Sequence, residues 1–402
     1  TGGYNFFGGS NSGRKNLTGS QNVGVGVFSL YNNESGTGNT ALGYASFQGV
    51  ASNSASDNTT VGKYAGQYLT TGSQNTILGV NAGQYKTTAS GSVLIGYDAG
   101  SGGLSATTGY DVAVGYYALK TGGGGTSVAV GYQALQTSAA TAQGNVAVGY
   151  GASKDLSTGS NNTTLGALAG GLVTTGGGNT FLGRSAGYFN STGSSNVAIG
   201  GSDTLYGNQT GSNNVAIGPN ALKGTVGQSH SNNVAIGNQA GIIITTGSYN
   251  FFGGAYAGDA VTTGSYNVAL GYGSMGASAG VTGSNNVALG RQAGEDLTSG
   301  AYNVLVGWNS GASLTTDSGN TFLGYRAGLY VTSSNNVAIG HDALTGVSGS
   351  STGNATVAIG HQAGRSQTSG GNNTYVGELV GEYNSTGANN AAFGYRALQG
   401  VS

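Results

Sequence analysis

Apolar and small residues recur along this 402-residue chain at a nearly constant interval. The clearest copies read Ser-Asn-Asn-Val-Ala-Ile/Leu-Gly, at 212–218, 231–237, 284–290 and 334–340. If the closing glycine is taken as the anchor of each copy, the sequence contains 23 anchors, and 13 of the 22 spacings between them are 17 residues. A period this steady predicts one continuous repeat domain over residues 1–402.

The three residues before each anchor predict a short β-strand. Val or Thr stands three residues before most anchors and Ile, Leu or Val one before most of them, as in Val197 and Ile199. Side chains alternate along a strand, so these two share a face, which we expect to point into the core. We therefore expect a charge at a residue such as Ile217 to disrupt several coils.

The residue between them, here called the strand centre, is then expected to face outward. It would form an exposed stripe of mostly small apolar residues, and a stripe of this kind indicates an interface with another chain. The stripe would contain Ala41, Ile77, Leu94, Ala113, Ala129, Phe181, Ala198, Leu305 and Phe322.

After each anchor the pattern predicts a tight bend, a second short strand and a turn. Ala or Ser stands three residues after most anchors, and the second strand is expected at stretches such as 68–70, 242–244 and 260–262. One coil cannot bury its own apolar face, so the coils must stack. The sequence thus predicts an all-β parallel β-solenoid (β-roll) of about 23 coils, which at about 4.8 Å per coil would span about 110 Å.

Asparagine occupies the position four before the anchor, the ladder position, in 19 of the 23 copies. Stacked coils would place these side chains one above another, where their amides can bond from coil to coil. Ser92, Asp111, Ser127 and Thr356 replace asparagine in the remaining copies. The predicted structural ladder includes Asn75, Asn196, Asn214, Asn233, Asn267, Asn286 and Asn336.

Composition narrows the possible functions. The chain has 82 glycines, no cysteine, only 6% charged residues and a net charge of −1. The charge predicts no nucleic-acid partner, and the lack of cysteine excludes disulfides and thiolate metal sites. No apolar run is long enough to span a membrane. Because the chain begins at Thr1 and both ends fall inside a repeat, we expect it to be a piece of a longer protein whose caps lie elsewhere.

The residues directly after the anchors, here called the post-anchor row, carry the candidate chemistry. Tyr97, Tyr116, Tyr132 and Tyr150 follow one another in successive coils, and Trp308 stands in the same register, so the row is a candidate glycan-binding surface. An aromatic row can equally stabilise the fold by packing alone.

His341, His361 and Glu378 occupy that row in three further coils. Two imidazoles and a carboxylate can bind a transition metal, and the alternative is a solvated polar row. The acidic residues are otherwise scattered, and the neighbours Glu295 and Asp296 should face opposite ways. We therefore expect no enzymatic activity and no cofactor.

The copies at 195–200 and 284–290, with Ala or Ser three residues later, resemble the head repeats of YadA-type trimeric autotransporter adhesins. Turns such as 320–328 are also similar to repeats of bacteriophage tail fibres. The resemblance covers nearly the whole chain and implies a left-handed β-roll, a homotrimer and an adhesive role at a cell or virion surface. The adhesin coils are usually shorter than the coils counted here.

The sequence thus favours an extracellular fibre that attaches to a host-surface glycan or protein receptor and associates with copies of itself. Two alternatives remain open at this stage. One is a structural surface filament whose subunits stack end to end, and the other is a glycan-binding or carbohydrate-active tail spike.

Overall fold

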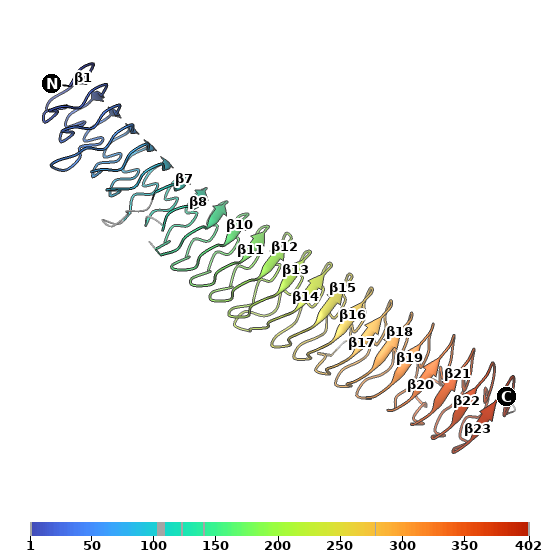
Figure 1. Cartoon of the computed structure of the whole chain (residues 1–402). Coiled ribbons are helices and arrows are strands. Elements are labelled where there is room, and N and C mark those ends of the chain that lie inside the picture. The colour runs from blue at the N-terminus through green and yellow to red at the C-terminus, as the bar shows by residue number, and fades with distance from the viewer. Residues whose placement is uncertain (1, 103–108, 122–123, 140, 278, 401–402) are drawn as a thin grey trace. The chain divides into compact units, whose positions relative to one another are not determined.

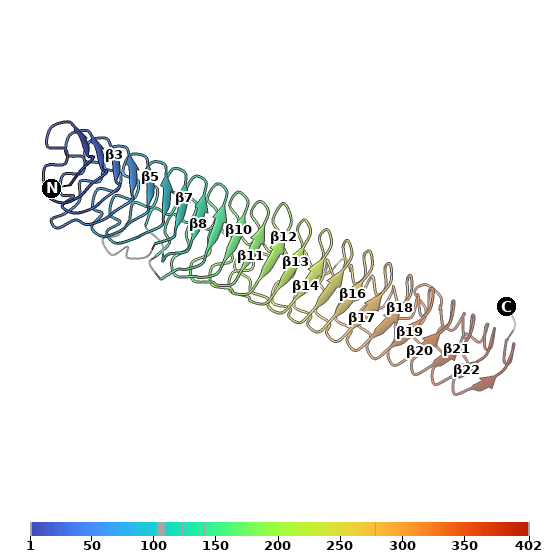
Figure 2. The same ribbon diagram turned by 45° about the horizontal axis from the view of Figure 1, so that its top comes forward.

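The computed structural model describes residues 2–102, 109–121, 124–139, 141–277 and 279–400, which form two compact units, Thr1–Ser202 and Asp203–Ser402. Within each unit the strands of successive coils lie side by side (Figure 1), and the turned view shows the loops that connect them (Figure 2). The prediction of an all-β parallel β-solenoid with a period near 17 residues is confirmed. A search of the described residues for a helix long and apolar enough to cross a membrane finds none.

The described residues of the first unit contain twelve strands of three residues each. They are β1 (Phe6–Gly8), β2 (Val23–Val25), β3 (Thr40–Leu42), β4 (Thr59–Val61), β5 (Thr76–Leu78), β6 (Val93–Ile95), β7 (Val112–Val114), β8 (Val128–Val130), β9 (Val146–Val148), β10 (Thr163–Leu165), β11 (Thr180–Leu182) and β12 (Val197–Ile199).

In the second unit, eleven strands of the same length lie within the part that the structure describes. They are β13 (Val215–Ile217), β14 (Val234–Ile236), β15 (Phe251–Gly253), β16 (Val268–Leu270), β17 (Val287–Leu289), β18 (Val304–Val306), β19 (Thr321–Leu323), β20 (Val337–Ile339), β21 (Val357–Ile359), β22 (Thr374–Val376) and β23 (Ala391–Phe393).

Successive strands within each unit pair in parallel and in register, so that equal positions of the repeat lie next to each other. Thr163 pairs with Thr180 across 17 residues, and Val337 pairs with Val357 across 20. A longer coil therefore keeps the strand register and places its extra residues in the turns.

The second strand predicted for each coil is wrong. Residues 68–70 and 242–244 are in turns or irregular backbone, and Val261 forms only an isolated bridge with Val281. The bend residues before them adopt left-handed backbone, for example Tyr64 at φ 62° and Gly66 at φ 58°, which interrupts an extended chain. The backbone still bonds from coil to coil there, as from the Tyr68 N–H to the Gln84 carbonyl at 3.0 Å.

The assignment of inward and outward strand faces is also wrong, and the true arrangement is the reverse. Every residue of the predicted outward stripe, from Ala41 to Phe322, is at most 1% exposed, and strand centres form the core. The outer strand residues, one and three before the anchor, face away from it: Leu323 is 47% exposed and Ile236 is 44% exposed. Ile217 is only half-buried, so it is not the core position it was expected to be.

The core is thin, and two positions share its volume. Where the strand centre is alanine, the residue four after the anchor is often large, as in the pairs Ala113 with Leu119 and Ala216 with Leu222. Where the centre is large, that residue is glycine. A Cβ on Gly187 would lie 2.6 Å from the Phe181 ring, so the ring occupies the space that a side chain would need. This complementarity fixes the strand centre as the inward position.

This exchange of volume is testable at Phe322 and Gly328. Replacing Phe322→Ala should leave a cavity and cost about 3–5 kcal/mol of stability. Adding Gly328→Leu should restore most of it, because Ala338 and Leu344 form the same pair in the next coil, and Leu344 adopts the left-handed φ of 47° that this position needs. Denaturant midpoints of the two variants measure the recovery; a double variant no more stable than Phe322→Ala would refute the shared core.

Candidate functional site

The outer strand residues form an exposed, uncharged apolar face in each unit. They are Val, Thr, Ile, Leu, Phe, Ala or Gly in all 23 described strands, and none is charged. In the first unit the exposed members include Val23, Leu42, Ile95, Leu165 and Leu182. In the second they include Ile236, Phe251, Val304, Leu323, Ile359 and Phe393. Exposed apolar surface of this extent usually marks an interaction site.

The post-anchor row borders this face, and in the first unit it carries a ladder of stacked tyrosines. Ring centroids lie 5.1 Å apart for Tyr97 and Tyr116, 5.5 Å for Tyr116 and Tyr132, and 5.3 Å for Tyr132 and Tyr150, with the rings within 12° of parallel. The four tyrosines are 41–57% exposed. The structure thus brings together the four tyrosines singled out in the sequence.

Trp308 lies in the second unit, where the post-anchor row contains aromatic and basic side chains. The Arg291 guanidinium lies 5.4 Å from the Trp308 ring centroid, and Tyr325 meets Trp308 edge to face at 5.4 Å. Cation–π contact holds Arg291 over the indole. Trp308 remains 45% exposed.

His341, His361 and Glu378 follow in that same row, but they contact one another in pairs. The two imidazole centroids are 5.4 Å apart, and His361 Nδ1 lies 3.6 Å from Glu378 Oε1. His341 Nδ1 instead lies 3.4 Å from Asp342 Oδ2. Among the residues that the structure describes, no group of three or more His, Asp, Glu or Cys side chains is arranged to hold a metal ion.

The ladder asparagines are buried and bonded between coils. The Asn75 side-chain amide donates to Asn58 Oδ1 at 2.9 Å and to the Ala89 carbonyl at 2.8 Å. Asn196 and Asn267 each donate a backbone N–H to the preceding asparagine side chain at 2.9 Å. The same register contains Asn214 with Asn233 (3.1 Å), Asn286 with Asn267 (3.1 Å) and Asn336 with Asn320 (3.3 Å). Each asparagine thus satisfies polar groups that the narrow core would otherwise leave unpaired.

Where asparagine is missing, other side chains continue the ladder. The Ser92 hydroxyl accepts the Asp111 N–H at 3.4 Å, and Asp111 Oδ1 accepts the Ser127 N–H at 3.2 Å. The charge of Asp111 is met by Lys86, whose Nζ lies 3.2 Å from Oδ2 with both side chains at most 1% exposed. Burial raises the pKa of Asp111, and the neighbouring ammonium opposes that rise.

This buried ion pair should be replaceable only as a pair. Lys86→Leu or Asp111→Asn alone should cost about 3–5 kcal/mol, because each leaves one buried charge unpaired. The double variant restores the leucine seen at Leu69 and the usual ladder asparagine, so its stability should lie within about 1 kcal/mol of the parent or above it. Unfolding midpoints of the three variants decide this; additive losses would contradict it.

His230 introduces a titratable group into the same buried region. Its Nδ1 lies 3.4 Å from Asn214 Oδ1 and 3.4 Å from Asn233 Nδ2. Burial lowers the pKa of His230 from its ordinary value to about 4, and the Leu222 backbone only partly offsets this. Glycine occupies the register in the flanking coils, at Gly211 and Gly247.

His230 should therefore make stability depend on pH. Its pKa is depressed in the folded state, so between pH 6.5 and about 4 the unfolded chain binds a proton that the folded chain does not. Stability should fall as pH falls through that window, by about 3 kcal/mol in total. Urea midpoints at pH 7 and 4.5 should differ less for His230→Gly than for the parent; equal pH dependence would show that His230 is not the cause.

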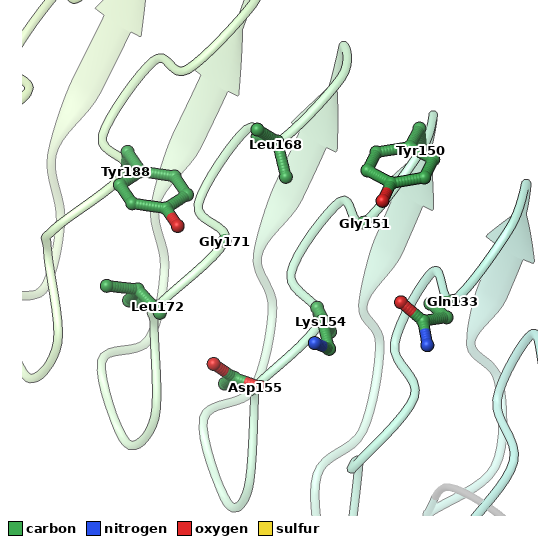
Figure 3. A pocket seen from close by; sticks show the side chains of 9 residues that line it. All are labelled: Gln133, Tyr150, Gly151, Lys154, Asp155, Leu168, Gly171, Leu172 and Tyr188. Atoms are coloured by element: carbon green, nitrogen blue, oxygen red, sulfur yellow. The ribbon is translucent and has the colours of Figure 1, made fainter.

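A small cavity lies at the end of the tyrosine ladder, beside Tyr150 (Figure 3). Its volume is about 120 Å³. It is lined by Gln133, Tyr150, Gly151, Lys154, Asp155, Leu168, Gly171, Leu172 and Tyr188. These residues come from four successive coils. Tyr150 is the only one of them that was predicted from the sequence. The available signal was the end of the tyrosine run, where Ala167 follows Tyr150 in the post-anchor row.

No known family model matches the chain, and no curated protein matches its sequence.

Proposed function

We propose that the chain is a segment of an extracellular attachment fibre, on a cell or virion surface, and that it associates with copies of itself through the outer strand face. The observation that carries the proposal is the exposed, uncharged apolar face of both units. An exposed face of Leu, Ile, Val and Phe is unfavourable in water, so its burial against a partner is the expected use.

A second copy of the chain is the partner that fits this face best. The face repeats once per coil, at the spacing of neighbouring strands, and a covering surface must repeat at the same spacing to match it. Another copy supplies that period by construction. Three copies around one axis, with left-handed coils, form the arrangement that the resemblance to trimeric adhesins implies, and they belong to the same proposal.

The tyrosine ladder supports attachment as the purpose of the fibre. Its four rings lie beside the proposed self-association face, with their edges open to solvent. Exposed aromatic rows supply large contact area at low entropic cost, which suits a surface that meets a glycan or a protein receptor. No catalytic role is part of this proposal.

The self-association is tested by adding charge to the outer face. Leu323→Asp with Ile359→Asp places two carboxylates where we expect the copies to meet, while both strand centres, Phe322 and Ala358, stay intact. The double variant should keep its circular dichroism and lose association, because buried unpaired charge is strongly unfavourable. Light scattering should give a mass near three chains of 39.2 kDa for the parent and one for the variant.

The matched control is Ser348→Asp with Ser350→Asp, which adds the same charge in an exposed turn of the same unit. It should associate like the parent. A parent chain that is monomeric at all concentrations, or a double variant that associates like the control, would overturn the proposal. Indefinite filaments would also contradict a closed trimer and favour end-to-end stacking.

A further inference from the structure

The cavity beside Tyr150 exists because two rows of the repeat are interrupted in one coil, the coil anchored at Gly166. In the post-anchor row, Ala167 takes the place of the next tyrosine, and Tyr150 is accordingly the most exposed ring of the ladder at 57%. Five residues after the same anchor stands Gly171, in a row that carries Lys154 and Tyr188 in the adjacent coils. One rung is therefore missing from both rows at the same level.

The two interruptions leave an opening between a pair of tyrosines. Tyr150 lies one coil before the gap and Tyr188 one coil after it, with Leu168 between them (Figure 3). The Tyr188 ring lies over Gly171, since a Cβ there would come within 2.7 Å of Tyr188 Cε2. The opening holds one small ring at most, because pockets for drug-sized ligands measure roughly 300–1,000 Å³.

Polar side chains border this opening without partners of their own. Gln133, Lys154 and Asp155 line it, and within the described part of the chain none of the three side chains forms a hydrogen bond or an ion pair. Elsewhere, glutamines in the row of Lys154 bond to each other along the solenoid, as Gln84 does to Gln67 at 2.8 Å. The cavity thus offers an amide, an ammonium donor and a carboxylate acceptor beside an aromatic face.

We propose that this cavity binds one pyranose ring of a glycan, which stacks on the open face of Tyr150 in the place of the missing rung. The apolar C–H face of a sugar packs on an aromatic ring, and its neighbouring hydroxyls both donate and accept hydrogen bonds. Lys154, Asp155 and Gln133 supply the matching groups. An aromatic side chain of a protein partner would stack equally well but would leave those three groups unsatisfied.

The proposal rests on the attachment function above and assigns its ligand. Saturation-transfer NMR on the intact chain, with the methyl glycosides of glucose, galactose, N-acetylglucosamine and N-acetylneuraminic acid as probes, tests it directly. At least one glycoside should receive saturation from the parent. Tyr150→Ala should weaken its binding at least roughly tenfold, through loss of the stacking face.

Ala167→Tyr is the sharper variant, because it fills the missing rung with the residue that the four preceding coils carry in this register. It should keep the fold and abolish binding. Ala255→Tyr adds the same side chain at the same register of the second unit and should bind like the parent. Circular dichroism of each variant checks that it is folded.

If none of the four glycosides binds the parent, or if binding survives both Tyr150→Ala and Ala167→Tyr, the proposal is overturned. Loss of binding in Ala255→Tyr equal to that in Ala167→Tyr would also overturn it, because it would separate the loss from the cavity. Light scattering on the same samples keeps the two proposals apart: a trimer that binds no glycoside refutes the cavity alone, and a monomer that binds one refutes the assembly alone.

Discussion

Hydrogen bonding between equal positions of successive coils is the constraint on which the rest of the structure depends. A coil of about 17 residues with a three-residue strand contains too little regular structure to satisfy its own backbone, so its N–H and C=O groups must bond to the coils beside it. This requirement keeps every strand in register, even where a coil is two or three residues longer. It also stacks identical side chains, and so it creates the asparagine ladder and the tyrosine ladder from the same repeat.

The narrow coil then decides what the core can contain. The strand centre and the bend share space in the interior, so alanine at one position often goes with a large residue at the other, and a ring such as Phe181 requires Gly187. The polar groups of the ladder asparagines and of the Lys86–Asp111 pair lie in this interior together with their bonding partners. The outer strand residues have no partner within the coil, which is why apolar surface accumulates on the outside of each unit.

The sequence was sufficient to predict the period, the parallel stacking and the positions of the strands, because these follow from repeated apolar residues and anchor glycines. It was not sufficient to orient the strands, since both faces of a Val-Ala-Ile segment are apolar and alternation alone does not rank them. The size exchange between pairs such as Ala216 with Leu222 and Phe181 with Gly187 would have decided the question. The second strands were wrongly predicted because bend residues such as Tyr64 and Arg326 adopt left-handed backbone without being glycine. Nothing in the sequence identifies such residues as bends.

The candidate site could likewise be predicted only in part. The tyrosine row could be predicted, because equal positions stack in any solenoid of fixed register. The cavity could not, because it depends on where Tyr188 lies relative to Gly171, one coil away and in a different row. A coil that lacks a side chain in an otherwise continuous row leaves room for a ligand. Interruptions of a repeat are therefore as informative about binding sites as its consensus.

The orientation of the strands is the central claim, and single cysteines test it most directly because the chain has none of its own. Ala235→Cys and Ile236→Cys place a thiol on adjacent residues of β14, one in the core and one on the outer face. The account predicts that the thiol at position 236 reacts with a soluble reagent, or cross-links to a second copy, under native conditions, whereas the thiol at 235 reacts only after unfolding. Equal or faster native reaction at 235 would contradict it.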